Sequence, residues 1–171
     1  MKVINLFGGP GCGKSTAAAG LFHIMKSKHM SVELVNEFAK EIVWENNLDA
    51  LKDQLYIFAN QNRKLKRLED KVEYAITDSP LLLTLIYMPE DYPKSFRQFV
   101  VDIDHCYNNK NFFINRVKSY IESGRVETEK QALAIDRRIE GSLRLGLYLA
   151  VDGGSNAPSK IYNRLFEENR K

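Results

Sequence analysis

The 171-residue sequence has few cysteines and no long apolar run, and each shortage excludes a class of protein. Two cysteines, Cys12 and Cys106, do not form the disulfide framework of a small secreted domain, so we expect reduced thiols in a cytoplasmic protein. No stretch approaches the roughly 20 apolar residues of a membrane span. Nothing after Lys2 resembles a signal peptide. The net charge of only +3 permits an anionic ligand without requiring nucleic acid.

The rest of the composition is typical of a soluble globular protein. Hydrophobic residues make up 44% of the chain and charged residues 27%, which are ordinary fractions for a domain with a packed core. A chain of 171 residues is long enough to bury such a core without disulfides or metals. We therefore predict one domain that spans residues 1–171.

Short apolar runs alternate with segments of helical periodicity. The predicted strands cover residues 2–7, 31–35, 73–77, 111–116 and 147–151. The predicted helices cover residues 14–30, 36–47, 53–71, 95–107, 128–145 and 160–168. Thr128, followed three residues later by Gln131, matches a capping box at the start of the fifth helix. This alternation favours an α/β fold, a three-layer sandwich in which helices cover both faces of a five-stranded parallel sheet.

Parallel sheets of this kind bind ligands at the carboxyl ends of their strands. The residues that follow the predicted strands are therefore the first candidates for a binding site. They are the loop after residue 7, the pairs Asn36-Glu37 and Asp78-Ser79, Arg116, and residues 152–155.

A glycine-rich loop follows the first predicted strand, where residues 6–16 read LFGGPGCGKST. The loop fits G-x-x-x-x-G-K-[ST] between a strand and a helix, which is a Walker A motif. Only a loop with little side chain lets several N–H groups converge on phosphate oxygens; a glycine turn that merely packs is the alternative. The predicted phosphate-binding residues are Gly8, Gly9, Gly11, Cys12, Gly13, Lys14, Ser15 and Thr16. We expect ATP as ligand, with Lys14 bridging its β and γ phosphates and Ser15 holding Mg²⁺.

Two carboxylates follow later strands. Asp78 has the position of a Walker B acid, which holds Mg²⁺ or orients a nucleophile, although an Asp there also suits a helix N-cap. Glu37 is placed to accept a proton from an attacking hydroxyl; its alternative role is that of an acid favoured by a helix N-terminus. The sequence leaves open which of the two is the base.

Arginines flank a polar segment at about residues 116–128, which we interpret as a lid. Arg116 and Arg125 are predicted to approach the transferred phosphate, with Arg137 and Arg138 as weaker candidates. A second group of basic residues lies on the third predicted helix and consists of Arg63, Arg67 and Lys71. Its spacing places these side chains on one helix face, which is either solvated or a track for a nucleic-acid backbone.

The segments GGPGCGKST, VNEFAKE, DQLYIFANQ and TDSPLLL occur in this order over residues 1–86. Together they resemble the P-loop nucleoside and nucleotide kinases related to the nicotinamide riboside kinase domain, including phage-encoded relatives. The resemblance implies that Glu37 contacts the substrate or acts as base and that Asp78 serves the metal or the substrate. It also implies that Arg116 and Arg125 approach the phosphates. No arginine follows Asp78 directly, unlike in thymidylate kinases, so the acceptor stays open.

We therefore predict a phosphotransferase, an ATP- and Mg²⁺-dependent kinase of a nucleoside, nucleotide or related hydroxyl acceptor. Two alternatives remain at this stage. In one, the acceptor is a hydroxyl of DNA, including a modified base, and the basic helix face guides the polymer. In the other, the protein is a nucleotide-dependent switch or ATPase without an acceptor. The sequence does not predict an oligomeric state.

Overall fold

The computed structural model of the chain describes residues 1–117, 119–121, 127–143 and 148–166. Within these residues, no helix is both long and apolar enough to cross a membrane. Both cysteines are free thiols, Cys12 buried and Cys106 exposed, as the cysteine content predicts.

The centre of the described structure is a five-stranded sheet with the order β2-β3-β1-β4-β5. Every pair of neighbouring strands is parallel. The strands are β1 (Lys2–Phe7), β2 (Val32–Val35), β3 (Tyr74–Thr77), β4 (Asn108–Asn115) and β5 (Leu149–Asp152). All of β1 after Lys2 is buried, which explains its continuous apolar run, because a central parallel strand is covered on both faces.

The register of the strands brings their carboxyl ends to one edge of the sheet. Val35, the last residue of β2, pairs with Thr77, the last residue of β3. Thr77 in turn pairs with Asn5, two residues before the end of β1. The loops that follow β1, β2 and β3 therefore leave the sheet at the same edge, and the loop after β1 lies between those of its two neighbours, β3 and β4.

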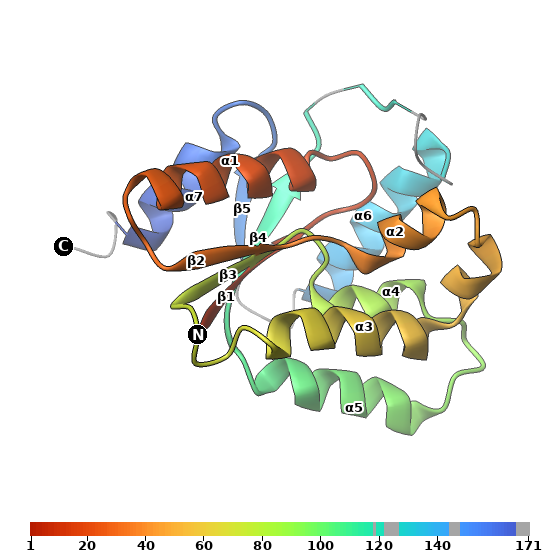
Figure 1. Ribbon diagram of the computed structural model, residues 1–171. Helices are drawn as coiled ribbons and strands as arrows, with labels where there is room; N and C mark the ends of the chain where they lie inside the picture. The colour runs from red at the N-terminus through yellow and green to blue at the C-terminus, as the bar shows by residue number, and fades with distance from the viewer. Residues whose placement is uncertain (118, 122–126, 144–147, 167–171) are drawn as a thin grey trace.

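Helices cover both faces of the sheet, with α1 and α7 on one face and α3 and α5 on the other (Figure 1). The helices are α1 (Lys14–Ser27), α2 (Phe38–Trp44), α3 (Gln54–Lys66), α4 (Thr84–Tyr87), α5 (Lys94–His105), α6 (Glu129–Leu143) and α7 (Ala157–Phe166), with 3-10 turns η1 (Leu48–Lys52) and η2 (Leu81–Leu83). Alternate side chains of β1 enter separate cores: Ile4 packs with residues of α1 and α7, and Val3 with residues of α3 and α5. The predicted three-layer α/β sandwich is confirmed.

The predicted helix boundaries need corrections. The helix predicted at 53–71 is wrong in its last part, because α3 ends at Lys66 and Asp70 adopts a left-handed φ of 59° that turns the chain into β3. The short helices η2 and α4 were not predicted, since the run of leucines there shows no period. The capping box is confirmed: the Thr128 amide donates to Gln131 Oε1 at 2.8 Å and the Gln131 amide donates to Thr128 Oγ1 at 3.4 Å.

Candidate active site

The glycine-rich loop connects β1 directly to the first turn of α1. Its conformation needs glycine: Gly8 has a φ of 141° and Gly13, the residue before α1, a φ of 104°. Side chains are strained at such angles. A Cβ at Gly8 would also lie 2.5 Å from Cys12 Sγ, whereas one at Gly13 would meet no atom within 4 Å. The space beside Gly13 is therefore open, and the N–H groups that begin α1 face it with the positive end of the helix dipole.

Lys14 and two hydroxyls follow the loop at the start of α1. The Lys14 ammonium folds back and donates to the backbone oxygens of Gly8 at 2.7 Å and Gly9 at 3.0 Å. Ser15 and Thr16 are exposed, and no acidic residue lies in this first turn. The arrangement combines a cation, hydroxyls and free helix amides, which suits the phosphates of a nucleotide.

Asp78 follows β3 and is buried beside this loop at the carboxyl edge of the sheet. Its Oδ1 has no hydrogen-bond partner in the described part of the chain. The alternative role as a helix cap does not apply, because η2 begins only at Leu81 and makes no side-chain cap hydrogen bond. A buried carboxylate oxygen without a partner destabilises the folded state unless a ligand pairs with it, and Mg²⁺ prefers oxygen ligands of this kind.

Glu37 is half-buried at the residue that precedes α2, where it makes no capping hydrogen bond to the helix. Burial raises the pKa of its carboxyl group above the ordinary value of 4.5. The neighbouring Lys14 ammonium lowers this pKa, and the Asp78 and Glu127 carboxylates raise it further. The structure thus brings Glu37 into electrostatic contact with the lysine of the loop and with the second candidate carboxylate.

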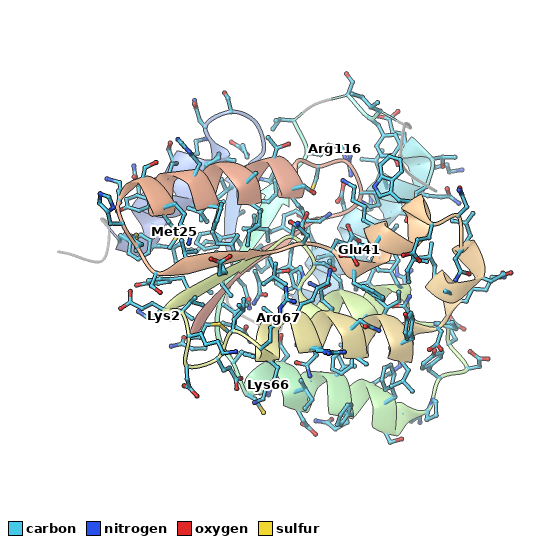
Figure 2. All side chains as sticks on the ribbon, in the orientation of Figure 1. Lys2, Met25, Glu41, Lys66, Arg67 and Arg116 are labelled. Atoms are coloured by element: carbon cyan, nitrogen blue, oxygen red, sulfur yellow. The ribbon has the colours of Figure 1, made fainter. Side chains whose placement is uncertain are left out.

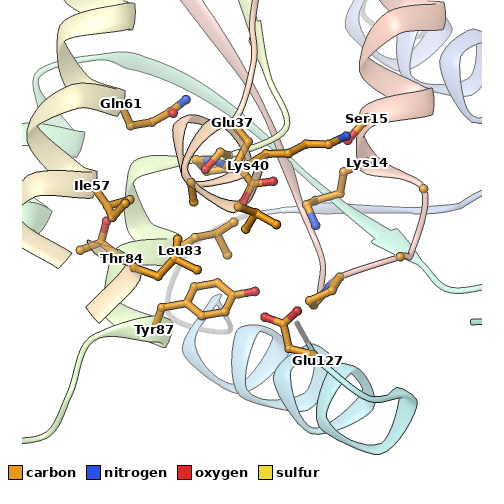
Figure 3. A pocket seen from close by; sticks show the side chains of 18 of the residues that line it. Lys14, Ser15, Glu37, Lys40, Ile57, Gln61, Leu83, Thr84, Tyr87 and Glu127 are labelled. Carbon is orange, nitrogen blue, oxygen red and sulfur yellow. The ribbon is translucent and has the colours of Figure 1, made fainter. Parts of the chain in front are cut away.

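A cleft of about 730 Å³ extends from the glycine-rich loop to α3. Lys14, Glu37, Gln61, Tyr87 and Glu127 contribute to its lining (Figure 3). Gln61 is fixed in place, since its Oε1 accepts from the Phe38 amide at 3.0 Å and its Nε2 donates to Thr77 Oγ1 at 3.3 Å. Sequence reasoning missed Tyr87 and Glu127, which lie in an apolar run and a polar segment without a motif. Only the fold places them in the cleft.

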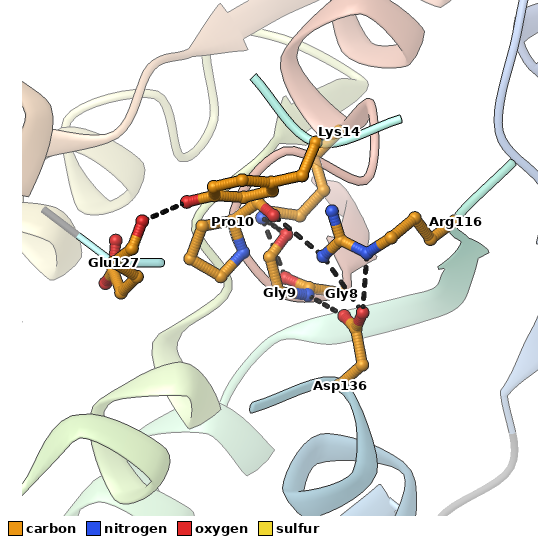
Figure 4. Close-up of polar contacts among 8 residues, drawn as sticks. Gly8, Gly9, Pro10, Lys14, Arg116, Glu127 and Asp136 are labelled. Carbon is orange, nitrogen blue, oxygen red and sulfur yellow. Dashed lines mark hydrogen bonds and ion pairs between the residues drawn. The ribbon is translucent and has the colours of Figure 1, made fainter. Parts of the chain in front are cut away.

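Arg116 follows β4 and reaches the glycine-rich loop, but through a network that the sequence did not predict (Figure 4). Its Nε and Nη2 donate to Asp136 Oδ2 on α6 at 3.0 and 2.9 Å, and Nη2 also donates to the Pro10 oxygen at 2.7 Å. Asp136 has no recognisable signal in the sequence. Arg125 lies outside the described residues, and Arg137 and Arg138 are exposed on α6.

The predicted basic helix face does not form, because Arg63 lies on α3, Arg67 caps its carboxyl end and Lys71 lies beyond it. Arg63, Arg67 and Lys71 are exposed, and Lys71 is only three residues before the start of β3, at the amino edge of the sheet. In Figure 2, Arg67 lies at the carboxyl end of α3, apart from Arg116. The glycine-rich loop is at the opposite edge, and none of these three basic residues lines the cleft, so they form no part of the candidate site.

The loop after β5 packs directly on the glycine-rich loop. The Gly153 amide donates to the Asn115 oxygen at 2.8 Å. A Cβ at Gly153 would lie 2.6 Å from the Cys12 backbone oxygen and 2.9 Å from that of Asn115. Because backbone atoms cannot rotate away from a new methyl group, only glycine at position 153 lets the loop after β5 pack this closely on the glycine-rich loop.

We expect Gly153→Ala to lower the free energy of unfolding by about 1–3 kcal/mol, the usual cost of overpacking. Gly141→Ala is the matched control, because a Cβ at Gly141 in α6 would meet no atom within 4 Å. The control should gain about 0.5–1 kcal/mol from helix propensity. Urea unfolding of both variants tests the pair, and equal stability of the two would contradict the close packing of Gly153.

We also expect Glu37→Gln to be more stable than the wild type at neutral pH. The folded pKa of Glu37 is raised by burial, so the folded state binds more protons than the unfolded state between pH 4.5 and that raised value. Stability therefore falls as pH rises through this window, and glutamine avoids the loss. The melting temperature of the variant should exceed that of the wild type at pH 7.5, and the gain should shrink toward pH 4. Glu45→Gln, an exposed change, should show no such trend.

Known proteins resemble this chain in sequence and in fold. The family model described as an AAA domain matches residues 3–151. Among solved structures, the fold is similar to that of deoxyadenosine kinase from M. mycoides with bound dATP, with a TM-score of 0.56. The two chains share 17% sequence identity over 95% of this chain and 98% of that one. No curated protein sequence matches. At this identity the likeness to the kinase shows a common fold.

Proposed function

The chain belongs to the family of AAA domains, and we propose that it is an ATP- and Mg²⁺-dependent kinase with a small nucleoside- or nucleotide-like acceptor. The fold that it shares with a deoxyadenosine kinase supports this class of reaction. The closer resemblance to the nicotinamide riboside kinase domain and its phage relatives stays a prediction. So do the single domain over residues 1–171 and the lid at residues 116–128, of which residues 118 and 122–126 lie outside the described part.

The cleft is the observation that carries the proposal. It leads from Lys14 into a chamber lined by Glu37, Gln61 and Tyr87, and its 730 Å³ is within the range of small-molecule sites. A nucleotide switch needs a phosphate-binding loop but no adjoining cleft for a phosphoryl acceptor. A DNA acceptor is less well supported, because the carboxylates of Glu37 and Glu127 line the cleft, whereas Arg67 and Lys71 lie beyond the end of α3, toward the amino edge of the sheet.

The loop residues would hold the triphosphate. We assign the phosphates to Lys14 and to backbone amides of residues 11–16, since Pro10 has no N–H and the Gly9 amide donates to Asp136. Ser15 and Asp78 would supply the oxygen ligands for Mg²⁺. The unpaired Asp78 Oδ1 fits such an ion. No group of three or more acidic, histidine or cysteine side chains forms a metal site in the described residues, which suits Mg²⁺ held mainly by phosphates and water. When bound, the ion would neutralise charge on the transferred phosphoryl group.

We assign the base to Glu37 rather than Asp78. Glu37 lines the cleft that would hold an acceptor, whereas Asp78 is buried with an unpaired Oδ1 that we assign to Mg²⁺. Its raised pKa makes it a better proton acceptor than an ordinary carboxylate. The acceptor oxygen would bond to the γ-phosphorus as the bond from that phosphorus to the bridging oxygen breaks. ADP leaves, and the hydroxyl proton passes to Glu37. Arg116 would stabilise the phosphates, and Arg125 is kept as a lid candidate.

The test is transfer of the γ-phosphate from labelled ATP with Mg²⁺. The acceptors are nucleosides, nucleoside monophosphates, nicotinamide riboside, and single- and double-stranded DNA with plain or hydroxymethylated bases. Label on a small molecule supports the proposal and names the acceptor. Label on DNA alone would replace it with a polymer kinase, and label in free phosphate alone with a hydrolytic switch.

A further inference from the structure

The Asp136 side chain on α6 contacts two other segments at the carboxyl edge of the sheet, namely Arg116 after β4 and the glycine-rich loop after β1. Its Oδ2 accepts two hydrogen bonds from Arg116, at 3.0 and 2.9 Å. Its Oδ1 accepts from the Gly9 amide in the glycine-rich loop at 2.5 Å. Both side chains of the ion pair are largely shielded from water, with 10% of the Arg116 side chain and 15% of the Asp136 side chain exposed. Such a pair is held more firmly than a surface salt bridge.

The guanidinium keeps one nitrogen out of this network. Arg116 Nη1 is buried and has no hydrogen-bond partner in the described residues. It lies beside Gly11, within 3.3 Å of the position that a Cβ there would take. The Tyr120 ring covers the guanidinium at 5.6 Å and also packs against Gly11. Asp136, Pro10 and Tyr120 thus fix the plane of the group and leave Nη1 at the glycine-rich loop.

Arg116 Nη1 has a counterpart of opposite sign. In the described part of the chain, the buried side-chain atoms without a partner are Arg116 Nη1 and Asp78 Oδ1. A donor and an acceptor are thus left unpaired near one loop. A buried group of this kind costs free energy until a ligand pairs with it. A phosphate with its cation would supply an acceptor for Nη1 and a positive charge for Oδ1.

We propose that Asp136 is a positioning residue that holds Arg116 against the glycine-rich loop with Nη1 kept for the terminal phosphate of a bound nucleoside triphosphate. The inference rests on the proposed function in that the ligand is a triphosphate, but it needs no phosphoryl acceptor. Because Asp136 accepts from Nε and Nη2 of Arg116, the orientation of the guanidinium is set before nucleotide binds. Through Gly9, the same carboxylate couples α6 to the loop.

The experiment compares the affinities of the β,γ-imido analogue of ATP and of ADP, each with Mg²⁺, by calorimetry. The ratio of the two affinities reports contacts to the terminal phosphate and is insensitive to a general loosening of the loop. Asp136→Asn should lower this ratio about tenfold, the worth of a hydrogen bond to a charged group. The same change in an Arg116→Ala background should lower it less than about twofold, because the residue acts through Arg116.

Glu129→Gln, an exposed change on the same helix, is the control and should leave the ratio unchanged. Melting temperatures without nucleotide show whether each variant folds. If Asp136→Asn does not fold, Asp136→Glu replaces it in both backgrounds. This variant keeps the negative charge but moves the carboxylate. An equal fall of the ratio in both backgrounds would show that Asp136 supports only the loop, and would overturn the inference, as would no change in either. A wild type that binds nucleotide but phosphorylates nothing would refute the kinase alone.

Discussion

Lys14→Ala is expected to reduce phosphoryl transfer by about a thousandfold or more, because it removes the one cation that the glycine-rich loop itself presents to the phosphates. The Lys14 ammonium donates to the backbone oxygens of Gly8 and Gly9. It must exchange these contacts for phosphate oxygens when ATP binds. The measurement is steady-state transfer of labelled γ-phosphate to whichever acceptor the panel identifies.

Lys28→Ala is the control for this variant, since Lys28 is exposed just after the carboxyl end of α1, whereas Lys14 begins that helix. It should change the rate by much less than Lys14→Ala. Melting temperatures separate a catalytic loss from a folding defect, because Lys14 also bonds two backbone oxygens. Substantial transfer by folded Lys14→Ala protein would contradict the phosphate-binding role of the loop.

Glu37→Gln is expected to lower kcat by about 10²–10⁴-fold, the range that a positioned general base contributes. Only the ionised carboxylate can accept the proton of the acceptor, so wild-type kcat should rise with pH through the raised pKa of Glu37. Glutamine cannot titrate, and this limb of the profile should disappear in the variant. Measurement of kcat between pH 5 and pH 9 tests both points.

Asp78→Asn distinguishes the two carboxylates. If Asp78 serves Mg²⁺, this variant should keep the pH limb and require a higher Mg²⁺ concentration for half-maximal rate. Loss of the limb in Asp78→Asn, with its retention in Glu37→Gln, would exchange their roles. The higher melting temperature expected for Glu37→Gln at neutral pH adds a check, because a variant that is slower yet more stable has not lost its fold.

The sequence predicted well those features that depend on neighbouring residues. The capping box of Thr128 and Gln131 is one example, since both partners lie in one turn of chain. The end of α3 shows the limit. Helical periodicity continued past Lys66, but the chain has to turn near Asp70 to enter β3, and that requirement comes from the sheet rather than from local preference.

The sequence alone determined the glycine-rich loop between a strand and a helix and the parallel sheet, because the glycine spacing and the alternation of strands and helices are local patterns. The tertiary structure decided the rest of the site. Asp136 and Gly9 are 127 residues apart along the chain, and nothing near either residue indicates that they meet. Tyr87 and Glu127 enter the cleft in the same way. Such contacts exist only after the strands have paired, since a parallel sheet gathers distant loops at one edge.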